Sequence, residues 1–431
     1  MPFATGDGRM ARLTRALQHR NYRLFFAGQT VSLVGSWVTR IATSWLVYRL
    51  TGSELLLGIT AFAGQIPMLV LAPFAGVLAD RWNRHRMLVA TQVLSALQSL
   101  ALGVLALGGR ITVAQVIALQ LVQGVINSFD TPARQAFVVE MVDDRADLPN
   151  AIALNSSMFN ASRIIGPSIG GAVIAAVGEG WCFILDAVSY VAVIVSLLAM
   201  RLPARPPQRE RARIVDELRG GFGYVFGFAP VRELLLNVAL VGTMGMPYAV
   251  LMPVFAAKVL HGDAGTQGLL MGASGVGALA GTVYLASRHT VVGLGKVIVA
   301  STLMLSAGLI VFSFSHTLLV SLAVLPFVGA GMMLQAASAN TILQTVVEEE
   351  LRGRVMAFYS VAVLGTMPIG SLIAGIVANR IGAPRTIFIG AIACIFAALW
   401  FASRRPLLAR HVRPIYVERG ILPPPDETPA A

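Results

Sequence analysis

The chain has 431 residues, of which 56% are hydrophobic and only 13% are charged, with a net charge of +12 and a mean hydropathy of +0.73. Soluble domains carry about 25% charged residues, so this composition excludes a soluble enzyme and a disordered chain and favours an integral membrane protein. The positive charge would indicate nucleic-acid binding only if the basic residues were clustered on one solvated face.

Long apolar runs recur along the whole sequence. A bilayer core about 30 Å thick needs roughly 20 apolar helical residues for each crossing. The runs predict six spans at 24–48, 55–79, 87–107, 112–130, 151–177 and 181–200, and six more at 234–257, 267–286, 297–314, 317–339, 355–378 and 386–402. We therefore predict an all-α membrane protein with 12 transmembrane helices in two six-helix bundles, 24–200 and 233–402.

The basic residues are gathered on the side of the membrane that holds both termini. Of the 33 Lys and Arg residues, 26 lie on that side and 5 lie in the opposite loops. Cytoplasmic loops retain positive charge, so both termini are predicted to be cytoplasmic. Topology thus accounts for the net charge, and we expect no nucleic-acid partner.

Three segments lie outside the predicted bundles. Residues 1–23 are basic and lack the apolar core of a signal peptide, so we expect a cytoplasmic N-terminal segment. The interval 201–232 begins with a Pro-rich basic run and is interpreted as a cytoplasmic linker, whose second part has the pattern of an amphipathic surface helix. Residues 403–431 are predicted to form a disordered cytoplasmic tail.

The two halves of the chain resemble each other. ASRIIGPSIGG in the fifth span is loosely repeated as GTMPIGSLIAG in the eleventh, and TPARQAFVVEMV is matched by TILQTVVEEELRGR. Duplicated six-span halves are typical of secondary transporters that work by alternating access, and they disfavour a static pore.

Several motifs carry a more specific resemblance. They are GVLADRWNRHR between spans two and three, FDTPARQAFVVEMV from Phe129, MPYAVLMPVFA from Met246 and LRGRVMAFYS from Leu351. Over residues 20–402 the chain resembles the major facilitator superfamily, and within it the drug:proton exporters similar to the enterobactin exporter and macrolide efflux proteins. The resemblance implies a monomer in the bacterial cytoplasmic membrane that exports a small amphipathic molecule by proton antiport, without a cofactor.

The first motif resembles the loop motif of that superfamily, with Asn83 where a second Gly is usual. The resemblance implies that Asp80 faces the start of span eleven and that Arg84 pairs with Asp130, closing the cytoplasmic side. Positive-inside charge and a tight turn would alone explain the basic residues. The gate residues expected on this basis are Gly76, Asp80, Arg81, Arg84, Asp130 and Arg134.

The fifth span contains a motif that resembles the one associated with antiport. Its residues are Gly166, Pro167, Gly170 and Gly171. The proline removes one backbone hydrogen bond, and the glycines permit bending or close helix contact. The alternative interpretation is a kinked helix that is merely well packed.

Three charged residues stand out because they lie well inside predicted spans, where charge is costly and therefore a sign of function. They are Arg40, Arg163 and Asp186. A helix rise of 1.5 Å per residue places them at similar depths, which allows an Arg–Asp ion pair. Asp186 is then either a structural partner of Arg40 or Arg163, or the proton carrier if that pair opens during transport.

Other polar residues recur in steps of three and four, which places them on single helix faces. The substrate-cavity candidates are Gln29, Ser36, Gln120, Gln123, Asn127 and Asn160 in the first half, and Asn237, Tyr248 and Gln335 in the second. Hydrogen bonding between helices is the alternative role. A cationic, polar half opposite an apolar half suits an amphipathic substrate that is neutral or anionic.

Enzyme chemistry has no visible basis in the sequence. All six histidines lie outside the predicted spans, no metal site is indicated, and no ATP-binding glycine loop occurs, so an ion gradient must supply the energy. The two cysteines, Cys182 and Cys394, are expected to be buried small side chains. The alternatives to a drug exporter are a narrow siderophore or metabolite exporter, a lipid or lysolipid transporter, and a receptor without flux.

Overall fold

The computed structural model describes residues 14–201, 223–288 and 290–423, and within these ranges the side chains of residues 72, 73, 76, 77, 79–81 and 350 are outside the description. The described residues form helices joined by short turns, and no strand occurs among them. The chain divides into two compact units. Met252–Gly272 belongs to the first unit, although it follows the start of the second half in the sequence.

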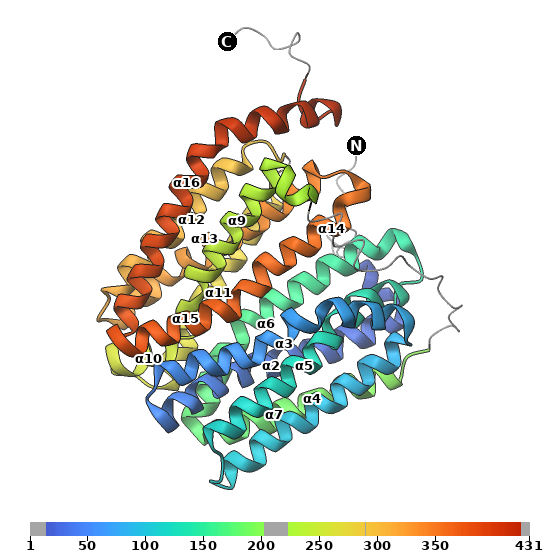
Figure 1. Cartoon of the computed structure of the whole chain (residues 1–431). Coiled ribbons are helices and arrows are strands. Elements are labelled where there is room, and N and C mark those ends of the chain that lie inside the picture. The colour runs from blue at the N-terminus through green and yellow to red at the C-terminus, as the bar shows by residue number, and fades with distance from the viewer. Residues whose placement is uncertain (1–13, 202–222, 289, 424–431) are drawn as a thin grey trace, which may run out of the picture. The chain divides into compact units, whose positions relative to one another are not determined.

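Six long helices build most of the first unit, coloured blue to green in Figure 1. They are α2 (Arg20–Thr51), α3 (Glu54–Arg81), α4 (Arg84–Leu107), α5 (Val113–Phe137), α6 (Leu148–Val177) and α7 (Glu179–Leu198), with the short turns η1 (Arg15–Gln18), η2 (Val138–Glu140) and η3 (Arg145–Asp147). Helix α2 packs against α6 and α7, α3 against α5, and α4 against α5 and α7.

The second unit contains most of the helices coloured from yellow-green to red in Figure 1. They are α9 (Ala229–Met244), η4 (Met246–Ala249), α12 (Leu294–Ser313), α13 (Leu318–Val346), α14 (Glu349–Ser360), η6 (Val361–Gly365), α15 (Thr366–Ile381) and α16 (Ala383–Glu418). Helix α12 packs against α13 and α16, and α9 packs against α15 and α16. The first unit takes α10 (Met252–Val254) and η5 (Phe255–Val259), and α11 (Ala264–Ala286) is shared between the units.

Local sequence signals set the starts of several helices. Ser53 caps α3, and Thr112 and Gln115 form a capping box at the start of α5 with hydrogen bonds of 3.3 and 2.8 Å. Asn83 caps α4, because its Oδ1 accepts a hydrogen bond from the backbone N–H of Arg86 at 3.0 Å. The residue that departs from the loop motif thus has a structural role.

One junction is the same in both halves. Gly178 alone joins α6 to α7, and Gly382 alone joins α15 to α16. Their φ angles of 89° and 85° lie in the region that favours glycine. The equivalent turn between the fifth and sixth spans, and between the eleventh and twelfth, supports the predicted internal duplication.

Nine helical stretches of the described chain are long and apolar enough to cross a membrane. Helices α2, α5 and α6 do not meet that limit of apolarity, yet their 32, 25 and 30 residues are long enough to cross. These are the three helices on which the sequence predicts the main polar faces. Together the two sets give the twelve predicted crossings.

Each unit has an apolar core and an apolar surface. Phe25 and Phe137 are buried in the first unit, and Phe401 is buried in the second. Large apolar side chains are also exposed, including Val188 at 61% and Leu319 at 79%. Such surfaces suit a bilayer, because the helices satisfy their own backbone hydrogen bonds and need no water.

The predicted tail is wrong in its first part. Residues 403–418 are not disordered but continue α16 to Glu418, because Leu408 and Tyr416 are buried in the core of the second unit. Residues 424–431 lie outside the described chain. Most of the predicted linker, 202–222, also lies outside it, whereas Val225 is buried in the same core.

Candidate functional site

Asp186 lies inside the first unit with only 1% of its surface exposed. Ser99 of α4 donates a hydrogen bond to Oδ2 of Asp186 at 2.7 Å, and Oγ of Ser189 lies 3.5 Å from Oδ1. Gly35 of α2 faces the same carboxyl group, since a methyl group there would lie 2.8 Å from Oδ1. Helices α2, α4 and α7 therefore enclose this acid and offer it hydroxyl donors.

The ion pair suggested for Asp186 is not the arrangement found. The hydrogen bonds that the structure gives to its carboxyl group come from hydroxyls, and not from Arg40 or Arg163. The guanidinium of Arg40 instead lies 4.8 Å from the centroid of the Trp37 ring, a cation–π contact. Arg40 follows Gly35 by five positions, which turns Arg40 about 140° away from the Asp186 side of α2.

The predicted polar face of α5 is used largely for hydrogen bonds within the first unit. Gln120 donates to Oγ1 of Thr43 on α2 at 3.4 Å. Gln123 donates to Oγ of Ser95 on α4 at 3.1 Å and to Oδ1 of Asn127 at 3.0 Å. Asn127 itself is exposed, so it presents a polar group on the surface of this unit.

The remaining candidates of the first half are mostly packed. Gln29 and Asn160 are 4% and 7% exposed, and the amide of Asn160 donates to the backbone carbonyl of Ser156 at 2.9 Å. The hydroxyl of Ser36 lies 3.3 Å from that of Tyr190. By contrast, Arg40 is exposed like Asn127, although both belong to membrane-crossing helices. Lipid would penalise such groups, which favours contact with water or substrate.

The candidates of the second half link helices. Gln335 of α13 donates to Oδ1 of Asn237 on α9 at 2.9 Å, and Asn237 donates to the carbonyl of Ala397 at 3.3 Å. Both side chains are buried. The hydroxyls of Tyr248 and Ser274 lie 2.6 Å apart. These contacts match the alternative role of polar residues as interhelical hydrogen-bond partners.

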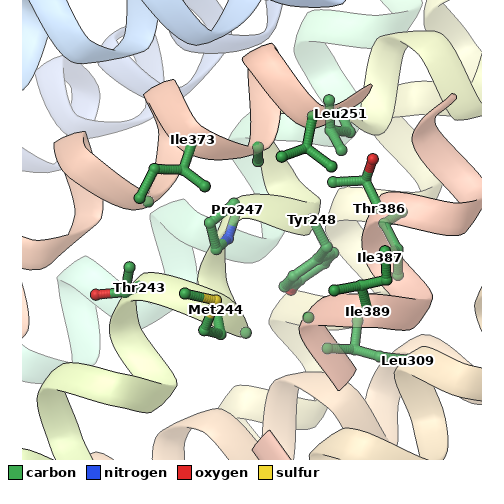
Figure 2. Close-up of a pocket in the computed structure, with 15 residues that line it drawn as sticks. Thr243, Met244, Pro247, Tyr248, Leu251, Leu309, Ile373, Thr386, Ile387 and Ile389 are labelled. Atoms are coloured by element: carbon green, nitrogen blue, oxygen red, sulfur yellow. The ribbon is translucent and has the colours of Figure 1, made fainter. Parts of the chain in front are cut away.

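The ring of Tyr248 also lines a small pocket in the second unit, at the break between α9 and η4. Figure 2 shows Met244, Leu309, Ile373 and Ile387 around it. The pocket has a volume of about 60 Å³ and is mainly apolar. An apolar wall in this half agrees with the expected contrast between the two halves.

The predicted gate pair between Arg84 and Asp130 is replaced by two other pairs. Nη1 of Arg84 lies 3.0 Å from Oε1 of Glu140 and also donates to the carbonyl of Ala136 at 3.3 Å. Asp130 pairs with Arg134 at 3.2 Å, one helical turn away. Glu140 of η2, which follows α5, therefore pairs with Arg84 in place of Asp130.

Asp130 is buried, with 6% of its surface exposed, and it has hydrogen-bond partners on a neighbouring helix. Thr91 and Gln92 of α4 donate to its Oδ1 at 2.9 and 2.8 Å. The side chains of Asp80 and Arg81, and any contact made by Gly76, lie outside the described chain. The predicted contact of Asp80 with the start of span eleven stays a prediction.

The glycines of the antiport-like motif bring helices into close contact. A methyl group on Gly166 would collide with the side chain of Trp37, and one on Gly170 would lie 3.2 Å from Cα of Val38, so α6 packs tightly on α2. A methyl group on Gly171 would lie 2.7 Å from the backbone oxygen of Ala264 in α11. Pro167 is buried within a helix that continues past it.

Sequence reasoning missed Gly35 and Ser99, because a single small residue carries no signal of what it faces. It also missed two ion pairs at the helix ends opposite the termini, Arg49 with Glu179 and Lys258 with Glu54. Their basic members, Arg49 and Lys258, are two of the five Lys and Arg residues in the loops predicted to lie opposite the termini. The scarcity of basic residues in these loops is a signal in the sequence that the few present have partners.

Comparisons with known proteins cover nearly the whole chain. A family model described as transmembrane secretion effector matches residues 14–410. The staphyloferrin A transporter of Staphylococcus aureus (strain NCTC 8325 / PS 47) is 24% identical over 386 residues, which cover 89% of this chain and 96% of that protein. The multidrug efflux pump Tap of Mycolicibacterium fortuitum is 29% identical over 373 residues, which cover 83% of this chain and 89% of the pump.

A solved structure of similar fold is a bacterial homolog of the human lysosomal transporter Spinster, in an inward-facing and unoccupied conformation. Its TM-score is 0.70 at 13% sequence identity, with 92% of this chain and 98% of that chain covered. The likeness confirms the predicted fold class. The family match confirms the resemblance drawn from the motifs, and it identifies a transporter and not an enzyme.

Proposed function

Because the chain belongs to the transmembrane secretion effector family of the major facilitator superfamily, we propose that it exports a small amphipathic molecule in exchange for protons. The bacterial cytoplasmic membrane, with both termini in the cytoplasm, is the proposed location. The 26 basic residues on the side of the termini support this orientation.

The substrate class follows from the relatives and from the charge of the two halves. A staphyloferrin A transporter and a multidrug efflux pump are both similar over more than four-fifths of the chain. Arg40 and Arg163 add positive charge to the first bundle, whereas the pocket around Tyr248 in the second is mainly apolar. A siderophore or a drug with one polar and one apolar part fits this division.

The observation that carries proton coupling is the environment of Asp186. Its carboxyl group is buried between three helices, and the hydroxyl groups of Ser99 and Ser189 contact its two oxygens. An acid held by hydroxyl groups can gain or lose a proton without breaking an ion pair. A buried charge inside a membrane is costly. Gain or loss of this proton therefore changes the stability of the packing of α2, α4 and α7 around Asp186. We propose Asp186 as the proton carrier.

The test uses proteoliposomes with an imposed pH gradient and an internal pH dye. Lipophilic drugs and siderophores are screened for substrate-evoked proton movement, and substrate binding is measured in parallel. We expect Asp186→Asn to reduce proton movement by about tenfold or more while it keeps substrate binding. The matched control is Glu179→Gln, which removes another buried acid of α7 that is paired with Arg49.

The other outcomes separate the alternatives. Normal proton movement in Asp186→Asn would make Asp186 a structural residue. Transport of lysolipid but not of drug or siderophore would identify a lipid transporter. Binding without counterflow for every compound would indicate a receptor that does not transport.

A further inference from the structure

Helix α4 carries a row of buried polar side chains, although it is apolar enough overall to cross a membrane. The row, here named the α4 row, consists of Thr91, Gln92, Ser95, Gln98 and Ser99, which are between 1% and 5% exposed. Steps of three and four residues place these side chains on one side of the helix. Buried polar groups are costly without partners, so the partners of the α4 row indicate what it does.

A buried acid lies at each end of the α4 row. Ser99 donates to Oδ2 of Asp186 at 2.7 Å. At the other end, Thr91 and Gln92 donate to Oδ1 of Asp130 at 2.9 and 2.8 Å. Thr91 precedes Ser99 by eight residues, which is about 12 Å along the helix. The α4 row therefore leads from Asp186 to an acid nearer the start of α4, which is predicted to face the cytoplasm.

The hydroxyl group of Ser99 has two acceptors within reach and one proton to donate. Oδ2 of Asp186 lies 2.7 Å away, and Oε1 of Gln98 lies 3.4 Å away. An ionised Asp186 takes this proton, because a hydrogen bond to a charged acceptor is the stronger one. A protonated Asp186 instead donates to Ser99, which then turns its own proton toward Gln98. Ser99 can thus follow the protonation of Asp186 without losing a hydrogen bond.

Ser95 lies halfway along the α4 row. Its Oγ accepts a hydrogen bond from Nε2 of Gln123 on α5 at 3.1 Å, and the hydroxyl of Tyr190 on α7 interacts with it as well. Four residues, or about 6 Å along the helix, separate Ser95 from Thr91 and also from Ser99. A hydrogen bond between two hydroxyls spans only about 2.8 Å, so each gap needs one intervening group.

Two buried acceptors near Ser95 indicate that the intervening group is water. Oε1 of Gln92 and Oε1 of Gln123 have no hydrogen-bond partner among the residues that the structure describes. Neither amide can be turned round, because Nε2 of Gln92 donates to Asp130 and Nε2 of Gln123 donates to Ser95. A buried water molecule bonds two to four polar groups and can donate to such oxygens.

We infer that the α4 row, with water bound at these two amide oxygens, is a proton relay from Asp186 to Asp130. The inference rests on the proposed function, in which Asp186 is the proton carrier. The carboxylic acid of Asp186 gives its proton to Ser99 and becomes a carboxylate. Each hydroxyl and water along the row accepts one proton and passes on another, and the carboxylate of Asp130 receives the last one.

Asp130 is placed to pass this proton to water. Its Oδ2 lies 3.2 Å from Nη2 of Arg134, whose side chain is 27% exposed, so water reaches this end of the relay. The relay has one direction of use in the proposed antiport, from the buried carrier toward the predicted cytoplasmic side. The alternative role of the α4 row is to brace α4 against α5 and α7, without proton transfer.

The first experiment changes Ser95, which lies between the two acids. Val and Thr have nearly the same shape and differ by a methyl group in place of a hydroxyl, so Ser95→Thr is the matched control for Ser95→Val. In proteoliposomes, we expect Ser95→Val to slow substrate transport driven by a pH gradient by about tenfold or more. Ser95→Thr keeps a hydroxyl and should transport at close to the rate of the wild type.

Substrate counterflow in the absence of a pH gradient separates the relay from packing. Exchange of substrate for substrate needs no net release of protons, so Ser95→Val should retain it. A defect of helix packing would slow counterflow and gradient-driven transport together, and that outcome would overturn the relay. Unchanged gradient-driven transport in Ser95→Val would overturn it as well.

The second experiment uses a change that preserves side-chain size. Thr91→Val removes the hydroxyl next to Asp130 and leaves Gln92 in place as its partner, and it should reproduce the separation expected of Ser95→Val. Thr60→Val is the control, because Thr60 of α3 is also buried and donates only to the carbonyl of Leu56 in its own helix, at 2.7 Å. Equal gradient-driven rates in these two variants would overturn the relay. Absence of substrate-evoked proton movement in the wild type would instead overturn the proposed function, so the two failures are distinct.

Discussion

Gly35 of α2 and Asp186 of α7 are in such close contact that a methyl group on the glycine would lie 2.8 Å from Oδ1 of the acid. The same methyl group would lie 2.5 Å from Oγ of Ser189. The space that holds the buried carboxyl group therefore depends on a residue without a side chain, on a different helix.

We predict that Gly35→Ala displaces Asp186 and lowers the stability of the first unit. Overpacking of this kind costs about 1–3 kcal/mol. The melting temperature in detergent and substrate-evoked proton movement should both fall. Gly353→Ala is the control, because nothing lies within 4 Å of a methyl group at that position of α14. Equal melting temperatures for the two variants would contradict the prediction.

Arg84 pairs with Glu140 and not with Asp130. A double-mutant cycle can test this pairing. We predict that Arg84→Gln and Glu140→Gln are not additive, with a coupling energy of about 1 kcal/mol or more in the free energy of unfolding. The reason is that Nη1 and Oε1 lie 3.0 Å apart, and both side chains are largely covered. Thermal or denaturant unfolding of the four proteins gives the coupling directly.

The control cycle combines Arg84→Gln with Asp130→Asn. Asp130 has its own partners in Arg134, Thr91 and Gln92, so its loss should add to that of Arg84. A coupling that is larger with Asp130 than with Glu140 would restore the pairing expected from the family resemblance.

The twelve crossings could be predicted because each needs about 20 apolar residues, a constraint that leaves a visible mark. The partner of Arg84 could not be predicted, because Asp130 of α5 and Glu140 of η2 lie on consecutive elements. Only the path of the chain through η2 decides which of the two acids reaches Arg84. The contact of Gly35 was hidden for a related reason. Which face of a helix meets its neighbour depends on helix rotation, to which one glycine contributes no pattern.

The helical extension of α16 has a signal in the sequence. Leu408, Val412 and Tyr416 are spaced by four residues, which places them on one face. Their burial against the core of the second unit explains why this basic, Pro-containing stretch is helical. Charge and proline suggested disorder, and tertiary packing overrode both.

His19 provides a pH-dependent contact at the start of α2. Its Nδ1 lies 3.2 Å from Asp143 and its Nε2 lies 3.1 Å from Asp147. Burial lowers the pKa of the His19 imidazole, but the hydrogen bonds and charges of Asp147 and Asp143 outweigh burial, so the pKa is raised above its ordinary value of 6.5.

A raised pKa in the folded state means that protonated His19 stabilises the fold. This stabilisation is fully present below pH 6.5 and is lost as the pH rises through the folded-state pKa. We predict that the melting temperature of the wild type falls more steeply than that of His19→Gln over this rise in pH. Parallel curves for the two proteins would show that the contact does not contribute.

Neighbouring glycines of α6 should differ in their importance, because they face different partners. A methyl group on Gly171 would lie 2.7 Å from the backbone oxygen of Ala264, which cannot turn aside, whereas one on Gly170 would lie no closer than 3.2 Å to α2. We predict that Gly171→Ala reduces substrate flux severalfold more than Gly170→Ala does, because its methyl group forces α6 away from α11. Flux in proteoliposomes is compared at equal protein density. If Gly170→Ala were the more damaging change, packing of α6 on α2, and not the contact with α11, would limit transport.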